Sequence, residues 1–311
     1  MTDITIGLIN NMPDSAFEAT ESQFRGLLEA AVGGPVRLRL TTLPEVPRSA
    51  DTKAYIAQQY APLQALMAEP PDALIITGTE PIAPDLRDEP YWSRFAKLVD
   101  WSIAESLPSI WSCLAAHGAV LHLSGIQRQR LGEKCCGVFA HKVQARHALM
   151  SGLGQSLLTP HSRWNDLPIG SLEDAGYSVL SAREETGANV FLKQQNGAQL
   201  VFLQGHPEYE SESLLKEYRR DIGRYVRSQQ PFYPTLPHEY FTPAALTLLD
   251  EFRLRAQAQR APQVMSTFPL AEIQASLVQT WRTGAVQLYR NWLKSVTAGR
   301  RPMSHKAHGV L

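Results

Sequence analysis

Three residues suited to acyl-transfer chemistry follow two apolar segments of the chain. Cys113 comes directly after LPSIWS and before the helical pattern LAAHGAVLHL, whereas His206 and Glu208 lie in QGHPEYE, directly after AQLVFL. A cysteine thiolate can attack a carbonyl carbon, a histidine can carry the proton, and a carboxylate can orient the imidazole. A cysteine at the end of a strand also fits simple packing, because cysteine is among the most buried residue types. The two segments together favour a Cys113–His206–Glu208 triad.

Backbone amides near Cys113 are candidates for holding the negative charge that develops on a reacting carbonyl oxygen. A helix that starts at Leu114 has unpaired N–H groups at its first turn, and these favour both a thiolate and an oxyanion. The segment LIITGTEP, residues 74–81, is a second strand end with a glycine-containing turn. We therefore expect an oxyanion hole made by the backbone of Thr79, Glu80 and Leu114, although a plain strand-to-helix turn has the same pattern.

Other charged residues are candidates for substrate binding. Glu217 and Arg220 lie three residues apart on one face of a predicted helix. Glu217 could pair with the ammonium group of a free amino acid while Arg220 binds its carboxylate, and a surface ion pair is the simpler explanation of the same spacing. Lys134 and HSRW, residues 161–164, are expected in loops, where they could bind a carboxylate or a phosphate.

The composition argues against several classes of partner. Thirty basic residues balance thirty acidic ones among 311, so no net field attracts nucleic acid or an anionic membrane. No apolar run reaches the roughly 20 residues that span a bilayer, and the N-terminus lacks signal-peptide features, which favours the cytoplasm. No P-loop, Rossmann fingerprint or HExxH motif is present, and the adjacent Cys135 and Cys136 are expected to be packing residues. We therefore expect no metal and no permanently bound cofactor.

The first half of the chain alternates short apolar segments with helical patterns. Strands are expected near residues 5–10, 37–43, 72–78 and 107–113, with helices over 17–32, 54–69 and 91–106. Strands separated by helices in this way are typical of a doubly wound α/β fold around a mostly parallel sheet. The predicted triad would then lie at the carboxyl ends of the strands, where such folds bind ligands.

The second half is richer in turns. Short apolar segments surround the pair Asn196-Gly197, which is a strong hairpin signal and predicts an antiparallel extension of the sheet. A helix is expected over 211–228, a proline-rich extended connection over 231–243, and two further helices near 243–260 and 270–297. We expect one domain over 1–298, with a C-terminal helical extension from about 240 that could form a homodimer interface, and a flexible tail over 299–311.

These motifs together resemble those of the homoserine O-acyltransferases, of the succinyl and acetyl type, which have the flavodoxin-like fold of class I glutamine amidotransferases. The resemblance extends along nearly the whole chain and rests on IGLINNMP, ITGTEP, DEPYW, the Cys113 turn, CGVFAHKV, PHSRW, QGHPEYE, KEYRRD and WRTGAVQLYRNWL. It implies an acyl-CoA co-substrate, a thioester on Cys113, and transfer to the hydroxyl of homoserine in methionine biosynthesis. It also implies that Lys134, Ser162 and Arg220 contact substrate and that Glu217 lies near the amino group.

Two positions depart from the family pattern. The family commonly has a lysine after the N-terminal Met-Pro, where this chain has Asp14 and Ser15. Donor choice in the family is tied to a glycine or a glutamate shortly after the TG pair, where this chain has Glu80 and Ile82. A carboxylate or a bulky side chain there should disfavour a succinyl carboxylate and favours acetyl, whereas naming within the family favours succinyl.

Three other functions remain open from the sequence. A serine acceptor is one methylene shorter than homoserine, and a pocket discriminates a methylene by only about 1–3 kcal/mol. A glutaminase or cysteine hydrolase would use the same fold, but such enzymes usually have a glycine two residues after the cysteine, where this chain has Ala115. In a non-enzymatic binding module, Cys113 would serve only in packing.

Overall fold

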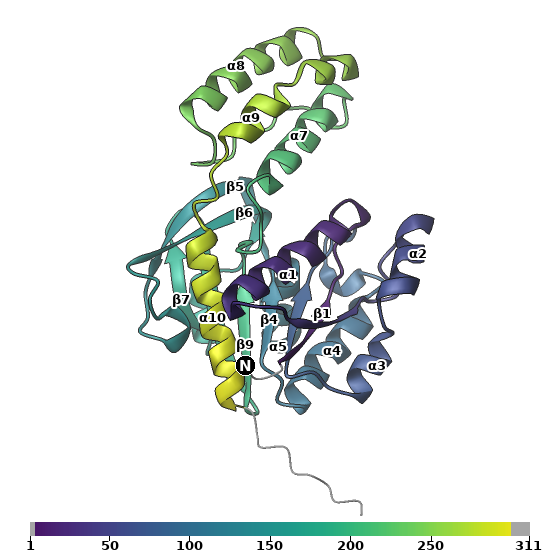
Figure 1. Cartoon of the computed structure of the whole chain (residues 1–311), viewed down its shortest axis with the longest axis vertical. Helices are drawn as coiled ribbons and strands as arrows, with labels where there is room; N and C mark the ends of the chain where they lie inside the picture. The colour runs from purple at the N-terminus through teal and green to yellow at the C-terminus, as the bar shows by residue number, and fades with distance from the viewer. Residues whose placement is uncertain (1–3, 300–311) are drawn as a thin grey trace, which may run out of the picture.

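A nine-stranded sheet runs through the part of the chain that the computed structural model describes, residues 4–299 (Figure 1). Its strand order is β2-β1-β3-β4-β9-β8-β7-β5-β6. Neighbours from β2 to β9 pair in parallel, and the pairs from β9 to β6 are antiparallel. This confirms the predicted doubly wound sheet with an antiparallel extension.

The strands are β1 (Thr5–Ile9), β2 (Arg37–Thr41), β3 (Ala73–Thr77), β4 (Ser109–Ser112), β5 (Gln129–Val143), β6 (Ser156–Asp166), β7 (Ser178–Arg183), β8 (Gly187–Gln195) and β9 (Ala198–Leu203). The α-helices are α1 (Phe17–Val32), α2 (Ala50–Gln59), α3 (Leu63–Ala68), α4 (Trp92–Ala104), α5 (Leu114–Ser124), α6 (Ile169–Asp174), α7 (Ser213–Val226), α8 (Pro243–Ala258), α9 (Leu270–Ser276) and α10 (Arg282–Gly299). None of these helices is long and apolar enough to cross a membrane.

Helices cover both faces of the sheet. On one face, α1 and α10 contribute Phe24, Leu28, Tyr289 and Trp292 to a buried apolar cluster. On the other face, α3, α4, α5 and α6 pack over a second cluster that includes Trp111 of β4. Burial of both faces accounts for the continuous apolar sequence of β3 and for the adjacent apolar residues Ile110 and Trp111 of β4.

A third apolar cluster lies outside these two layers. It joins α7, α8 and α9, which project together beyond the β5–β6 end of the sheet (Figure 1). The chain then returns, because α10 runs back along the sheet beside α1. The predicted C-terminal extension thus has two parts, a projecting helical group and one helix in the main core. The single domain and the dimer interface stay predictions.

Two predicted helices are each divided in the structure. The pattern over 54–69 forms α2 and α3, because Tyr60 has an extended backbone and Pro62 begins a new helix. The pattern over 270–297 forms α9 and α10, which are separated by the segment that carries Trp281. The predicted tail over 299–311 lies outside the described residues except for Gly299, which ends α10.

Lys134 and HSRW were expected in loops, and this is wrong, since both lie on paired strands. Lys134 is on β5, where the register with β6 shifts between Arg130 and Cys135. This bulge breaks the two-residue alternation that identifies a strand. On β6, the inward positions Thr159, His161 and Arg163 are buried but polar, so the strand lacks the apolar pattern of a half-buried strand.

Candidate active site

Cys113 occupies a strained turn between β4 and α5. Its backbone angles are φ 52° and ψ −113°, a region that residues with a Cβ atom rarely adopt. Its N–H donates to the carbonyl of Leu203 on the neighbouring strand β9, at 2.7 Å. The turn therefore holds the cysteine at the carboxyl edge of the sheet, directly before the free N–H groups of α5.

This strain predicts an effect on stability that separates glycine from alanine. Because φ and ψ at Cys113 mirror an ordinary extended conformation, glycine adopts them without penalty. We expect Cys113→Gly to exceed Cys113→Ala in free energy of unfolding by about 1 kcal/mol, measured by urea denaturation. Ala54→Gly on the exposed face of α2 is the matched control and should instead destabilise. Equal stability of the two Cys113 variants would contradict a strained turn.

His206 joins Cys113 to Glu208. The imidazole interacts electrostatically with Cys113, and its Nδ1 lies 2.9 Å from Oε1 of Glu208. His206 is 5% exposed and Glu208 is 3% exposed, so bulk water does not screen these interactions. Burial alone would lower the pKa of His206, but the negative charges of Cys113 and Glu208 outweigh it and raise the pKa well above its ordinary value. The arrangement therefore favours the imidazolium form of His206 beside Cys113.

The turn that carries His206 is held from several sides. The N–H of His206 donates to the carbonyl of Pro160 on β6, at 2.8 Å, and the ring of Tyr209 stacks on the imidazole with centroids 4.3 Å apart. The Trp281 indole N–H, just before α10, donates to the carbonyl of Tyr209 at 2.9 Å. These contacts fix the orientation of the imidazole, as an efficient proton acceptor requires.

Besides His206, Glu208 interacts with Tyr289 of α10. Its Oε2 is buried without a hydrogen-bond partner, and so is the hydroxyl of Tyr289. Burial first, and then the charge of Glu208, raise the pKa of Tyr289 well above its ordinary value. The C-terminal helix thus supplies part of the wall behind the triad.

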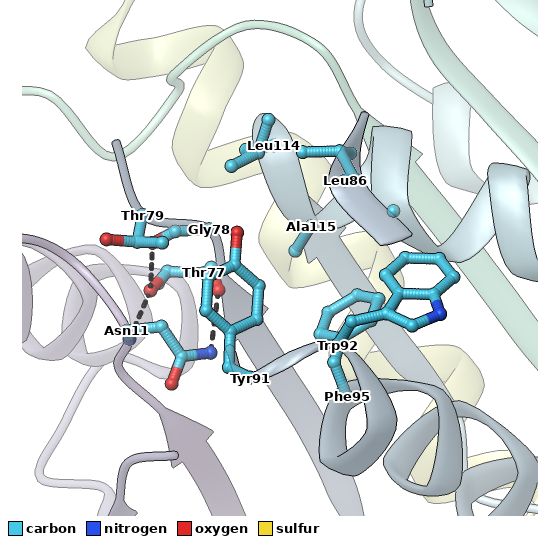
Figure 2. Close-up of a pocket in the computed structure, with 11 residues that line it drawn as sticks. Asn11, Thr77, Gly78, Thr79, Leu86, Tyr91, Trp92, Phe95, Leu114 and Ala115 are labelled. Carbon is cyan, nitrogen blue, oxygen red and sulfur yellow. Dashed lines mark hydrogen bonds between the residues drawn. The ribbon is translucent and has the colours of Figure 1, made fainter. Parts of the chain in front are cut away.

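The turn after β3 contacts the start of α5. A Cβ atom at Gly78 would lie 2.4 Å from Cβ of Leu114, so only glycine allows this close approach. Asn11 fixes the turn through bonds from its backbone N–H and its side chain to Thr77 (Figure 2). The predicted oxyanion-hole residues Thr79, Glu80 and Leu114 are therefore brought together.

A small apolar space lies beneath this turn, between Tyr91, Trp92, Phe95, Ala115 and their neighbours (Figure 2). Its volume of about 10 Å³ is enough for no more than a water molecule. These aromatic residues, which include the tyrosine and tryptophan of DEPYW, support α5 from below. They do not form a ligand site.

A much larger cavity of about 370 Å³ opens above Cys113. All ten residues predicted for the site line it, namely Cys113, His206, Glu208, Lys134, Ser162, Glu217, Arg220, Thr79, Glu80 and Leu114. They come from the ends of β3, β4 and β9, from β5 and β6, and from α7. The cavity is of a size that accepts a small substrate.

Glu217 is at the centre of a polar network in this cavity. Ser162 donates its hydroxyl hydrogen to one carboxylate oxygen, and Tyr209 donates to the other at 2.5 Å. Nζ of Lys134 lies 3.8 Å from Glu217. The network holds the Glu217 carboxylate at the cavity, which Cys113, His206 and Glu208 also line.

Asp221 and Arg224 extend this network along the same face of α7. Asp221 binds Lys134 at 2.7 Å and Arg220 at 3.0 Å, and Arg224 contacts Asp221 at 3.6 Å and Glu80 at 3.5 Å. Sequence reasoning missed both residues, although they lie four and seven residues after Glu217, at helical spacing. It also missed Tyr209, which directly follows Glu208.

A cation does lie near the position where the family commonly has lysine. Arg48 contacts the carbonyl of Met12 and lies 3.4 Å from Asp14. Its guanidinium is buried against Phe17 at 4.4 Å from the ring centroid, and Arg48 does not line the large cavity. Arg48 therefore stabilises the turn and leaves the positive charge at the site to β5, β6 and α7.

The remaining cysteines and histidines near the site have structural surroundings. Burial raises the pKa of Cys135, and it raises that of Cys136 to about 12, so both favour the unreactive thiol. Burial, followed by the charge of Arg163, lowers the pKa of His117 to about 3, and its Nε2 lies 2.8 Å from Gln204. His122 binds Asp100 on the surface at 2.7 Å.

Comparison with known proteins shows the family of this chain. The family model described as homoserine O-succinyltransferase matches residues 1–303. The chain is 44% identical over 294 residues to the homoserine O-succinyltransferase of Methylorubrum extorquens, covering 94% of this chain and 87% of that protein. It is 45% identical over 296 residues to the one from Rhodopseudomonas palustris, covering 95% and 89%.

Solved structures support the fold. A glutamine amidotransferase from Methylobacillus flagellatus aligns with a TM-score of 0.55 at 14% identity, covering 100% of both chains. A glutamine amidotransferase from Thermotoga maritima aligns with a TM-score of 0.54 at 11% identity, covering 95% of this chain and 99% of that one. At such identities the likeness shows the fold alone, and it confirms the predicted class I glutamine amidotransferase-like architecture.

Proposed function

The chain belongs to the homoserine O-succinyltransferase family and is an acyltransferase, and from this premise we propose that it acylates the hydroxyl of L-homoserine. The proposed donor is an acyl-CoA, and the acyl group passes through a thioester on Cys113. The observation that carries the proposal is the series Cys113–His206–Glu208 in one cavity that Glu217 and Arg220 also line.

In the first half-reaction, the Cys113 thiolate attacks the thioester carbonyl of acyl-CoA. A bond forms between Sγ and the carbonyl carbon, and the bond from that carbon to the CoA sulfur breaks. The His206 imidazolium gives its proton to the departing CoA sulfur. Backbone N–H groups of Leu114 and of the turn at Thr79 and Glu80 stabilise the oxyanion.

In the second half-reaction, the homoserine hydroxyl attacks the acyl group on Cys113. The neutral imidazole of His206 accepts the hydroxyl proton, a bond forms between that oxygen and the acyl carbon, and the bond to Sγ breaks. This step restores the thiolate and the imidazolium. Glu217 binds the ammonium group of homoserine and Arg220 its carboxylate, since both side chains line the cavity.

For the acyl group itself, we propose succinyl. Glu80, the carboxylate that would repel a succinyl group, is bound by Arg224, and six cationic side chains against four carboxylates line the cavity. Ile82 is 75% exposed and does not line the cavity. Acetyl is the second candidate, because the Glu80 side chain is 63% exposed and remains free to turn toward the donor.

Intact-protein mass spectrometry tests the proposal. Incubation with succinyl-CoA or acetyl-CoA should add the mass of one acyl group to the protein, and peptide mapping should place it on Cys113. Homoserine should discharge the adduct, serine should do so more slowly, and the better donor identifies the acyl group. Failure of every donor to form the adduct, or hydrolysis of glutamine in its place, would overturn the proposal.

Glu217 gives a prediction about the acceptor. We expect Glu217→Gln to raise KM for homoserine about 10- to 100-fold, because a hydrogen bond to a charged group contributes about 1.5–3 kcal/mol. KM for the acyl donor should change less than threefold. Steady-state kinetics with each substrate varied in turn measures both constants. The control is Glu212→Gln, which should change neither KM value. Glu212 is partly exposed, pairs with Lys216 and lies about one and a half helical turns before Glu217.

A further inference from the structure

The cations of the large cavity fall into two groups. Lys134, Arg220 and Arg224 are each within 4.0 Å of a carboxylate on α7. Arg163 is buried and bound to Asp166 at 3.1 Å. These four cations already have carboxylate partners within the protein, so each attracts a further anion less strongly than a cation without such a partner.

Arg128 and Arg130 form the second group. Within residues 4–299, neither has a carboxylate within ion-pair distance. Arg128 is half-buried and reaches only the backbone carbonyls of Ala83 and Pro84, at 3.5 and 3.2 Å. The exposed guanidinium of Arg130 lies 4.3 Å from the ring centroid of Trp164. Two neighbouring cations without an ion-pair partner add positive potential to one end of the cavity.

The carboxylates nearest to Arg128 are already engaged. Glu89 accepts hydrogen bonds from the backbone N–H groups of Ile82 and Ala83, both at 2.7 Å. Asp85 is bound by both the Nε and a terminal nitrogen of Arg87. The charges of Glu89 and Asp85 act on Arg128 only from beyond ion-pair distance, so Arg128 and Arg130 can each still pair with an external anion.

Trp164 adds an aromatic surface at the same place. It is 43% exposed, follows buried Arg163 on β6, and lines the cavity together with the two arginines. An exposed tryptophan next to arginines offers stacking to an aromatic base and paired hydrogen bonds to phosphate. β5 and β6 lie side by side at this end of the sheet (Figure 1), so the surface rests on paired strands.

We propose that Arg128 and Arg130 bind the phosphates of the nucleotide part of the acyl-CoA donor, and that Trp164 stacks on its base. This rests on the proposed function, since it assigns to one end of the cavity the portion of the donor that does not react. The acyl thioester then reaches Cys113 at the base, and the acceptor site at Glu217 and Arg220 stays free. Binding energy from the nucleotide would position the thioester for attack.

Kinetics with complete and shortened donors tests this assignment. Arg130→Gln should raise KM for acyl-CoA about 10- to 100-fold while leaving kcat, KM for homoserine and KM for the corresponding acyl-pantetheine unchanged. Arg146→Gln, an exposed arginine on the loop after β5, is the matched control and should behave as the unaltered protein. If Arg130→Gln raised KM for acyl-pantetheine as much as KM for acyl-CoA, the proposal would be overturned, because acyl-pantetheine lacks the nucleotide.

Calorimetry with coenzyme A keeps the test independent of turnover. Coenzyme A should bind Arg130→Gln at least tenfold more weakly than the unaltered protein and should quench tryptophan fluorescence in the latter but not in Trp164→Phe. Equal affinities would overturn the nucleotide site even where Cys113 is acylated. Absence of any acyl adduct together with weaker binding in Arg130→Gln would instead overturn the proposed function and leave the nucleotide site supported.

Discussion

Replacing Cys113 with alanine is expected to abolish the acyl adduct and to lower kcat by roughly 10⁴- to 10⁶-fold, the range found when members of a covalent triad are removed. The reason is that the thioester on Cys113 joins the two half-reactions, so that its loss leaves no route from donor to acceptor. Intact mass measured after mixing with donor reports the first half-reaction, and release of coenzyme A reports turnover.

The other two cysteines are the matched controls. Cys135 and Cys136 are half-buried on β5 as thiols with raised pKa values, so Cys135→Ala and Cys136→Ala should still form one adduct. If Cys113→Ala still gained the mass of one acyl group, or if Cys136→Ala failed to gain it, Cys113 would not be the nucleophile. The glycine variant at residue 113 separates lost chemistry from lost folding, because it relieves the strained turn and should also be inactive.

The proximity of Cys113, His206 and Glu208 could be predicted because each of them lies shortly after a strand. Parallel strands bring their carboxyl ends to one edge of a sheet, and β9 pairs in parallel with β4, so Cys113 after β4 and His206 after β9 lie near one another. The pairing of β4 with β9 places Ser112 directly opposite Leu203. Sequence order and strand chemistry were enough for this part of the site.

The other residues that line the cavity were harder to predict, because the strands that carry them lack the usual alternation of apolar and polar residues. Lys134 lies at a bulge and Ser162 on a strand whose buried residues are polar, so neither was recognised as part of a strand. Asp221 and Arg224 join the site because they pair with Lys134 and Glu80, which lie in distant parts of the chain. Such contacts follow from tertiary packing, which local spacing does not record.

The division of the C-terminal helices has a similar cause. Amphipathic patterns identified them as helices, but no local signal indicates which core a helix joins. α8 and α9 pack with α7, whereas α10 returns to α1, and Trp281 between them bonds to the turn that carries His206. The late segment WRTGAVQLYRNWL therefore serves the active site as well as the core.

Replacing His206 with asparagine should lower kcat about 10²- to 10⁴-fold, the usual contribution of a general acid–base residue. Asparagine retains a donor for the buried carboxylate of Glu208, so the fold should survive. His206→Ala removes that donor and should be less stable than His206→Asn by about 1–3 kcal/mol, the cost of a buried group without a partner. A His206→Asn variant with normal kcat would exclude His206 as the proton carrier. Urea denaturation of each variant measures its stability, so that lost activity can be distinguished from lost folding.

The pKa of His206 must change between the two half-reactions for this residue to serve both. Among the influences that raise it, the charge of Cys113 comes before that of Glu208. Acylation removes that charge, so the pKa should fall and the imidazole should lose its proton at a lower pH. Cys113→Ala imitates this state, and NMR titration should show its His206 releasing the proton at a lower pH than in the unaltered protein. If His206 titrated identically in Cys113→Ala and in the unaltered protein, the charge of Cys113 would not be what raises the pKa of His206. The change of His206 from proton donor to proton acceptor would then need another cause.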